Sequence, residues 1–308
     1  MVIGILSGLL WAVETVVMGI ALDMAPFIST PQAIALAPFV ATFLHDGVAA
    51  VLLLCMNAAR GKLKPLLRVA KSRDFKWLLL ASAIGGPIGM TGYVMCVNYM
   101  GPSVGAVASA VYPAVGTVLA FFFLKEKVKW YQWIFLCLTL LGVYGLSYSP
   151  TVNIENFWLG LLGAFMCSFG WGTEAVILAK CMKDPAIKSE FALNIRQAVS
   201  ALIYGIIILP LLGGWDVVPQ LFTFDTRWAF PAVAAAGFFA AVSCLFYYRA
   251  IAKIGASKAM ALNVTYTAWA ILFSFIFLGD KSILSPLTMV CAAVVVVCGI
   301  MAGKGSHH

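Results

Sequence analysis

The stretch 109–127, SAVYPAVGTVLAFFFLKEK, returns in altered form at 263–281 as NVTYTAWAILFSFIFLGDK. The separation stays at 154 residues for three matched pairs: Tyr112 with Tyr266, Phe121 with Phe275, and Glu126 with Asp280. A second repeated pattern matches Trp11 and Glu14 to Trp171 and Glu174, now 160 residues apart. These repeats predict two similar halves, residues 1–150 and 151–304, followed by a tag remnant at 305–308.

The runs around these repeats are apolar enough to cross a membrane. The chain is 63% hydrophobic and 10% charged, and a span needs roughly 20 apolar residues. Segments of about that length occur at 2–22, 33–58, 76–99, 103–124, 131–148, 157–181, 188–212, 228–251, 257–279 and 284–302. The short alternating segments of a membrane barrel are absent from the sequence. We therefore expect an all-α membrane protein of ten transmembrane helices.

The basic residues orient these helices. Most of the 20 Lys and Arg residues fall in segments that ten spans would place on one side, above all in the stretch 59–76. By the positive-inside rule, that side and both termini are cytoplasmic. Because each half has five helices, an odd number, the second half enters from the opposite face, which predicts an inverted repeat. The net charge of +8 reflects this asymmetry, and we expect the lipid bilayer, not nucleic acid, as the chain's surroundings.

Three acidic residues, Glu14, Asp46 and Glu174, lie inside predicted spans, where a carboxylate facing lipid would be costly. Glu14 and Glu174 each follow a tryptophan by three residues, so indole and carboxylate share one helix face. Trp11 would lie about halfway across the membrane. The two motifs therefore predict a central site at the interface of the halves. The alternative is that the tryptophans are packing or interface residues and the acids are hydrogen-bonded structural groups.

Aromatic residues at similar depth complete a possible cage. Tyr112 and Tyr266 are also near mid-membrane, and Asn263, Tyr266 and Trp269 advance in steps of three along one side of a helix. With Tyr93, they offer π faces opposite two carboxylates, an arrangement that suits an organic cation and above all a quaternary ammonium. Taken singly, each tyrosine could instead be a packing residue.

Two further polar pairs lie within the second and seventh spans: His45 with Asp46, and Arg196 with Gln197. We consider all four for coupling or gating. An intramembrane arginine often neutralises an acid, so Arg196 could pair with Asp46 or with a glutamate. His45 could relay protons, because its unperturbed pKa is near neutrality, or it could simply form a hydrogen bond.

Other functional classes find no support in the sequence. The eight cysteines are in apolar runs without paired ligand spacing, so neither a disulfide scaffold nor a metal site is expected. Motifs for ATP binding, metalloprotease or serine hydrolase activity are missing, and we expect no enzyme activity and no cofactor. The cluster Gly85, Gly86, Pro87 and Gly89 is typical of a hinge or of close helix packing.

The ten spans, the five-plus-five repeat and the run YPAVGTVLAFFFLKEKV together resemble the drug/metabolite transporter superfamily. Within it, the blocks GLLWAVET, GGPIGM, SAVYPAVGTVLAFFFLK, FGWGTEAV, IRQAVS and KAMALNVTYTAWAILF are similar to the LicB-type choline permeases of bacteria. The resemblance covers essentially the whole chain. It implies choline uptake through an aromatic-lined central cavity, and where the blocks match it points to Trp11, Glu14, Tyr112, Trp171, Glu174, Asn263, Tyr266 and Trp269. Tyr93 is outside those blocks, so its role rests on the residue pattern alone.

The expected function is thus a secondary transporter in the bacterial inner membrane that imports choline or a related quaternary ammonium. Coupling to protons or to the membrane potential is left open. The alternative is an exporter of amino acids or other small metabolites. The surroundings of Arg196 separate the two: an arginine facing the cage favours an amino acid, and an arginine packed against Asp46 favours a cation.

Overall fold

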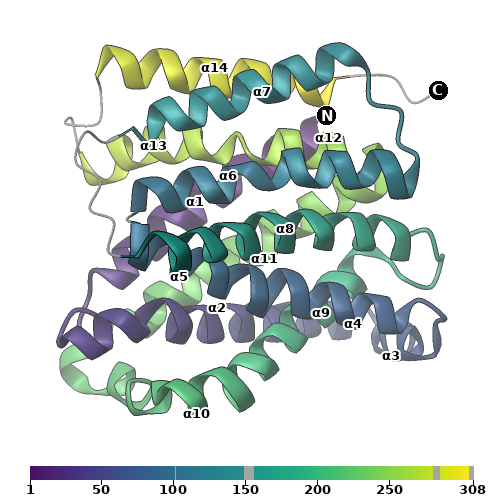
Figure 1. The fold of residues 1–308 in the computed structure, drawn as a ribbon. Helices are drawn as coiled ribbons and strands as arrows, with labels where there is room; N and C mark the ends of the chain where they lie inside the picture. The colour runs from purple at the N-terminus through teal and green to yellow at the C-terminus, as the bar shows by residue number, and fades with distance from the viewer. Residues whose placement is uncertain (101, 149–155, 280–284, 305–308) are drawn as a thin grey trace.

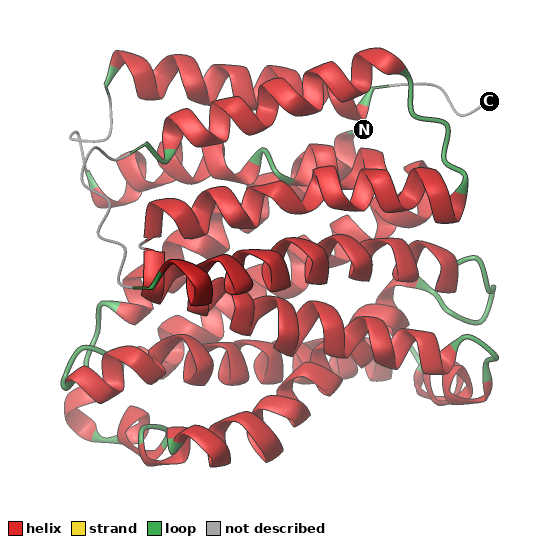
Figure 2. Ribbon diagram, viewed as in Figure 1, coloured by secondary structure: helices red, strands yellow, loops and turns green. Residues whose placement is uncertain are grey.

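The computed structural model describes residues 1–100, 102–148, 156–279 and 285–304, and most of these residues are helical (Figures 1 and 2). The predicted boundary between residues 150 and 151, the repeat residue Asp280 and the tag remnant at 305–308 are outside the described residues. The α-helices are α1 Val2–Leu22, α2 Pro31–Ala59, α3 Leu63–Arg68, α4 Phe75–Ala83, α5 Gly89–Met100, α6 Pro102–Leu119, α7 Trp130–Leu146, α8 Phe157–Cys181, α9 Ser189–Ile203, α10 Leu209–Leu212, α11 Ala229–Ile254, α12 Ala256–Asn263, α13 Tyr266–Leu278 and α14 Pro286–Gly303.

The expected all-α membrane fold is confirmed. Within the described ranges, nine helical segments are long and apolar enough to cross a membrane, and α7 is a shorter apolar helix of 17 residues. Together they correspond to the ten predicted spans, with ends that differ by a few residues. The third span is built from α4 and α5, the seventh from α9 and α10, and the ninth from α12 and α13.

The packing repeats between the two halves. Helix α1 packs against α11, and its counterpart α8 packs against α5. Similarly, α1 contacts α12 and α13, while α8 contacts α6. The helices α2 and α9 pack against each other, as do α7 and α14. Figure 1 shows α1 and α8 running in opposite directions, as an inverted repeat requires.

Helix starts follow local sequence signals. The hydroxyl of Thr30 accepts a hydrogen bond from the backbone N–H of Ala33 at the start of α2, and proline follows at the first helical position. The side chain of Asn156 accepts the N–H of Leu159 at the start of α8. These caps satisfy backbone donors that the first helical turn leaves unpaired.

The helices are interrupted at a few positions near their middles. A π-helical turn, Ile84–Ile88, joins α4 to α5 where the sequence reads IGGPI. Another, Tyr204–Ile208, joins α9 to α10. A turn at Val264 and Thr265 separates α12 from α13. Because π-helical turns often mark functional positions, these breaks draw attention to the centre of the bundle.

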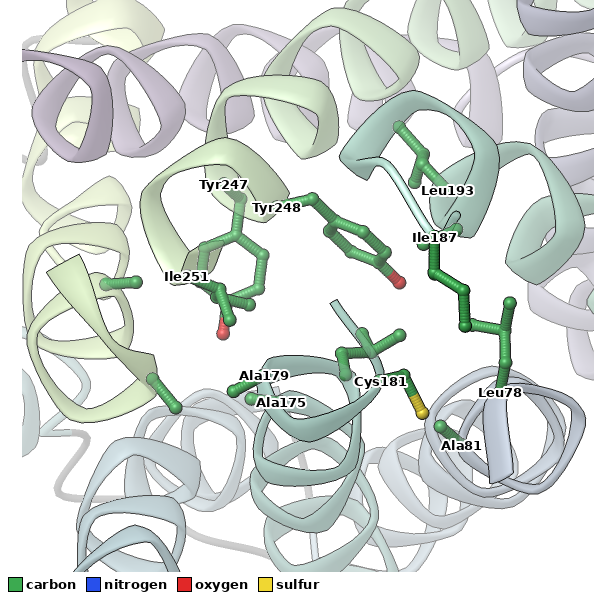
Figure 3. Close-up of a cluster of buried hydrophobic side chains, with 14 of the residues drawn as sticks. Leu78, Ala81, Ala175, Ala179, Cys181, Ile187, Leu193, Tyr247, Tyr248 and Ile251 are labelled. Atoms are coloured by element: carbon green, nitrogen blue, oxygen red, sulfur yellow. The ribbon is translucent and has the colours of Figure 1, made fainter. Parts of the chain in front are cut away.

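Glycines bring α5 and α8 close together. A Cβ atom added at Gly92 would be 2.7 Å from the carbonyl oxygen of Gly163, and one at Gly163 would be 2.7 Å from the amide nitrogen of Cys96. Only glycine fits at such a close approach. An apolar cluster gathers side chains from several helices, among them Ala175 and Ala179 of α8 and Tyr247 and Tyr248 of α11 (Figure 3).

The segments 59–76 and 182–190, which both carry Lys residues, meet at one end of the bundle. Lys62 Nζ is 2.9 Å from Glu190 Oε1, and Ser72 Oγ donates to Asp184 Oδ2 at 2.5 Å. The bond to Ser72 and a backbone bond from Ala186 lower the pKa of Asp184. In Figure 1, α3 lies at the same end of the bundle as the start of α1 and the end of α14.

Candidate functional site

The repeated tryptophan and glutamate motifs occupy equivalent places in the two halves. Trp11 and Glu14 are on α1, and both are partly exposed. Trp171 and Glu174 are on α8, where Trp171 is partly exposed and Glu174 is buried. The two side chains that carry the carboxylates are nevertheless exposed to similar extents, 13% for Glu14 and 11% for Glu174.

Aromatic rings gather around both tryptophans. The ring centroids of Trp11 and Tyr266 are 5.8 Å apart, a contact between α1 and α13. Trp171 stacks with Tyr93 at 6.1 Å and meets Tyr112 edge-on at 6.0 Å. Each group thus contains rings from both halves of the chain.

A hydrogen bond holds the indole of Trp171. Its Nε1 donates to the carbonyl oxygen of Gly85 at 2.9 Å, and Gly85 belongs to the π-helical turn of the third span. A Cβ atom at Gly89 would be 2.7 Å from the Trp171 ring. The small residues that suggested a hinge therefore also form the surface on which this tryptophan is positioned.

Asn263 differs from the sequence expectation in its backbone. It ends α12, and the turn that follows separates it from Tyr266 and Trp269, so the three residues do not share one uninterrupted helix. Its side chain is buried: Oδ1 accepts the Tyr112 hydroxyl at 2.8 Å, and Nδ2 donates to Ser7 Oγ at 3.1 Å. Asn263 thereby connects the Trp171 group to α1.

Charged side chains form a continuous series of contacts beside the rings. His45 Nε2 is 3.4 Å from Glu14 Oε1, and His45 Nδ1 is 2.9 Å from Asp46 Oδ1. The other oxygen of Asp46 accepts from Arg196 Nη1 at 3.1 Å, and Arg196 Nε donates to Glu174 Oε1 at 3.0 Å. This series of contacts begins on α1, passes through α2 and α9, and ends on α8.

Arg196 pairs with both acids that the sequence offered as partners, Asp46 and Glu174. Its Nη1 also donates to Gln197 Oε1 at 2.7 Å. The Tyr248 hydroxyl donates to Glu174 Oε1 at 3.1 Å. The guanidinium therefore has protein acceptors at Nε and at Nη1.

Trp269 has an unused donor. Among the residues described, none accepts a hydrogen bond from its Nε1, although that atom is buried. Its ring is one helical turn beyond Tyr266 on α13. A buried indole N–H usually has a partner, so this unpaired donor is unusual.

Some site residues were missed by the sequence reasoning. Ser7 receives the amide of Asn263, and Ser109 Oγ is 3.3 Å from the hydroxyl of Tyr266. Helical spacing could have found both: Ser7 precedes Trp11 by four residues, and Ser109 precedes Tyr112 by three. The role of Gly85 as the acceptor for Trp171 has no such signal, because it depends on contact between two distant helices.

Comparison with known proteins places the chain among transporters. The sequence profile of the EamA-like transporter family matches residues 1–148 and residues 158–302. Protein LicB of Haemophilus influenzae is 28% identical over 71% of this chain and 73% of its own length. The riboflavin transporter ImpX of Fusobacterium nucleatum is 23% identical over 89% of this chain and 91% of its own. A solved crystal structure shares the fold, with a TM-score of 0.72 over 98% of this chain and 96% of that one, at 16% identity.

Proposed function

The chain belongs to the EamA-like transporter family, a membrane transporter family within the drug/metabolite transporter superfamily, and from this premise we propose that it imports choline or a related quaternary ammonium. Transport is by alternating access of the two halves around a central site. The membrane is the bacterial inner membrane, with both termini cytoplasmic. Protons or the membrane potential supply the driving force.

One observation carries this proposal: aromatic rings and a partly exposed carboxylate meet in the middle of the spans. Glu14 is one turn from Trp11, whose ring contacts Tyr266. A quaternary ammonium has no N–H to donate, so it is held by ring faces and by diffuse negative charge. The free N–H of Trp269 is suited to the hydroxyl group of choline.

The surroundings of Arg196 weigh against the amino-acid exporter. The carboxylate of an amino acid would need a cationic group free to bind it. Arg196 instead contacts Asp46 at 3.1 Å and Glu174 at 3.0 Å, so its charge is already matched by two carboxylates. This arrangement favours a cationic substrate.

Isothermal titration of the purified protein tests the proposal. The ligands are choline, its neutral isostere 3,3-dimethylbutan-1-ol, and riboflavin. We expect choline to bind and the isostere to bind at least tenfold more weakly, since an aromatic contact to a desolvated cation is worth about 2 kcal/mol. Absence of choline binding would reject the proposal, and binding of riboflavin in its place would favour a vitamin transporter.

A further inference from the structure

The two carboxylates that the repeat makes equivalent have different basic partners. Glu14 on α1 is 3.4 Å from His45 of α2, and Glu174 on α8 is 3.0 Å from Arg196 of α9. In both halves the base belongs to the helix that follows the acid. One base is a histidine, whose charge depends on protonation, and the other is an arginine, which stays charged.

Glu174 is hydrogen-bonded by the protein through one of its carboxylate oxygens. Its Oε1 accepts from Arg196 Nε and from the Tyr248 hydroxyl. On its other side, a Cβ atom added at Gly85 would overlap Oε2 and the carboxyl carbon. The side chains of Glu174 and Glu14 are exposed to similar extents, 11% and 13%, so their partners and not their exposure distinguish them. This carboxylate therefore already has a cationic partner, Arg196, and a hydroxyl donor, Tyr248, before any ligand binds.

Glu14 is in a different position. Within the described part of the chain, the one recorded partner of its carboxylate is His45, at 3.4 Å. That imidazole is already engaged through Nδ1, 2.9 Å from Asp46. The Glu14 side chain keeps 13% of its surface exposed, and it follows Trp11 by one helical turn. Its negative charge is therefore available to a ligand among the rings.

We propose that Glu14 alone is the counter-ion of the transported cation. Glu174 and Arg196 form a fixed ion pair that positions α8 and α9 and adds no net charge to the site. The proposal rests on the function proposed above, and it replaces a symmetric pair of binding carboxylates with one binding and one positioning carboxylate.

The test compares how strongly each variant prefers choline to 3,3-dimethylbutan-1-ol in isothermal titration. This preference ratio isolates the contribution of the ligand's charge. Glu14→Gln should lower the ratio by about tenfold or more, because it removes the negative charge that attracts the quaternary nitrogen. Glu174→Gln should also lower it, since Arg196 is then left with one carboxylate fewer and repels the cation.

The decisive variant is the double change Glu174→Gln with Arg196→Gln. It removes one negative and one positive charge together, while Asp46 keeps its contact with His45. We expect the preference ratio to return to within about threefold of the wild type. A second double variant, Glu174→Gln with Arg196→Met, fills the space with an apolar chain, which buried ion pairs often tolerate, and should behave alike. Thermal unfolding of each variant verifies that it is folded.

The outcomes separate the two proposals. A wild-type protein that does not prefer choline to the isostere would reject the proposed function itself. A wild-type preference that survives Glu14→Gln would overturn the counter-ion assignment. The assignment would also be overturned if the double variants are folded but have a preference ratio as low as that of Glu174→Gln alone. Glu174 would then contact the cation directly.

Discussion

Trp171 links three parts of the candidate site through its side chain. Its indole donates to Gly85, stacks with Tyr93 and meets the edge of Tyr112. A ring fixed in this way can present its face to a cation without losing rotamer freedom on binding, so preorganisation adds to affinity. At the scale of single residues, Trp171 is therefore held in place by one hydrogen bond and two ring contacts.

We predict that Trp171→Ala weakens choline binding by about thirtyfold, the equivalent of roughly 2 kcal/mol for one aromatic contact to a desolvated cation. Isothermal titration measures the change. Trp158→Ala is the matched control, because Trp158 is on the same helix but is 75% exposed. Equal losses of affinity in the two variants would contradict a specific role for Trp171.

Among the elements, the π-helical turn of the third span packs closely against the linked charged side chains, because its Gly85 lies against the Glu174 carboxylate. A methyl group at Gly85 would displace the Glu174 carboxylate and disturb its bond from Arg196. We expect Gly85→Ala to destabilise the protein by about 1–3 kcal/mol, the usual range for overpacking, which a lower midpoint of thermal unfolding would report.

Gly47→Ala provides the control for that substitution. Gly47 is inside α2, and apart from its chain neighbours and the nearby backbone of α2 itself, no atom lies within 4 Å of a Cβ atom built there. Because alanine is the better helix former, the unfolding midpoint should not fall. If Gly85→Ala is as stable as Gly47→Ala, the close approach of the turn to Glu174 is not a constraint.

A second element-scale contact joins the halves through a helix cap. After α6, Glu126 accepts the backbone N–H groups of Ala256 and Ser257 at 2.8 and 3.1 Å, and also the Ser257 hydroxyl at 2.6 Å. These residues begin α12. Gly255 just before them has φ +88°, a conformation that suits glycine, and a Cβ atom there would be 2.8 Å from Glu126.

Loss of this cap should be measurable. We predict that Glu126→Ala lowers stability by about 1 kcal/mol, because an N-cap acceptor and a negative charge near a helix start both stabilise the helix. Thermal unfolding would detect the difference from Lys127→Ala, which changes the neighbouring exposed residue. If the cap does not stabilise the protein, Glu126→Ala and Lys127→Ala will have the same midpoint of thermal unfolding.

For the whole molecule, the basic connections define one side of the membrane. The contact between Ser72 and Asp184 joins the 59–76 and 182–188 segments, and Lys62 contacts Glu190 in the first turn of α9, so these segments lie at the same end. We predict that this end is cytoplasmic. In intact cells carrying a variant without the native cysteines, a membrane-impermeant thiol reagent should spare Lys64→Cys and Lys183→Cys but label Gln220→Cys. The reverse labelling pattern would invert the topology.

Alternating access is the second prediction at this scale. Because α1 packs on α11 as α8 packs on α5, the two halves can exchange conformations around a fixed centre. Spin labels on the halves, at positions 64 and 220, should show two distance populations whose ratio changes when choline is added. A single distribution that choline does not alter would argue against the exchange.

The sequence by itself determined the ten helices, because membrane spans depend on local apolar length, and it marked Trp11, Glu14, Trp171 and Glu174 through their repeat. Local pattern also supplied the polar residues His45, Asp46, Arg196 and Gln197, each of which must find a partner inside a membrane. The choice of partner was decided by tertiary structure alone. Arg196 reaches two acids from different helices, and Gly85 serves as the acceptor for Trp171, because helix packing brings together residues far apart in the chain. Helix packing also gives Glu14 and Glu174 different basic partners. Their sequence surroundings match, but Glu14 contacts a histidine of α2 and Glu174 contacts an arginine of α9.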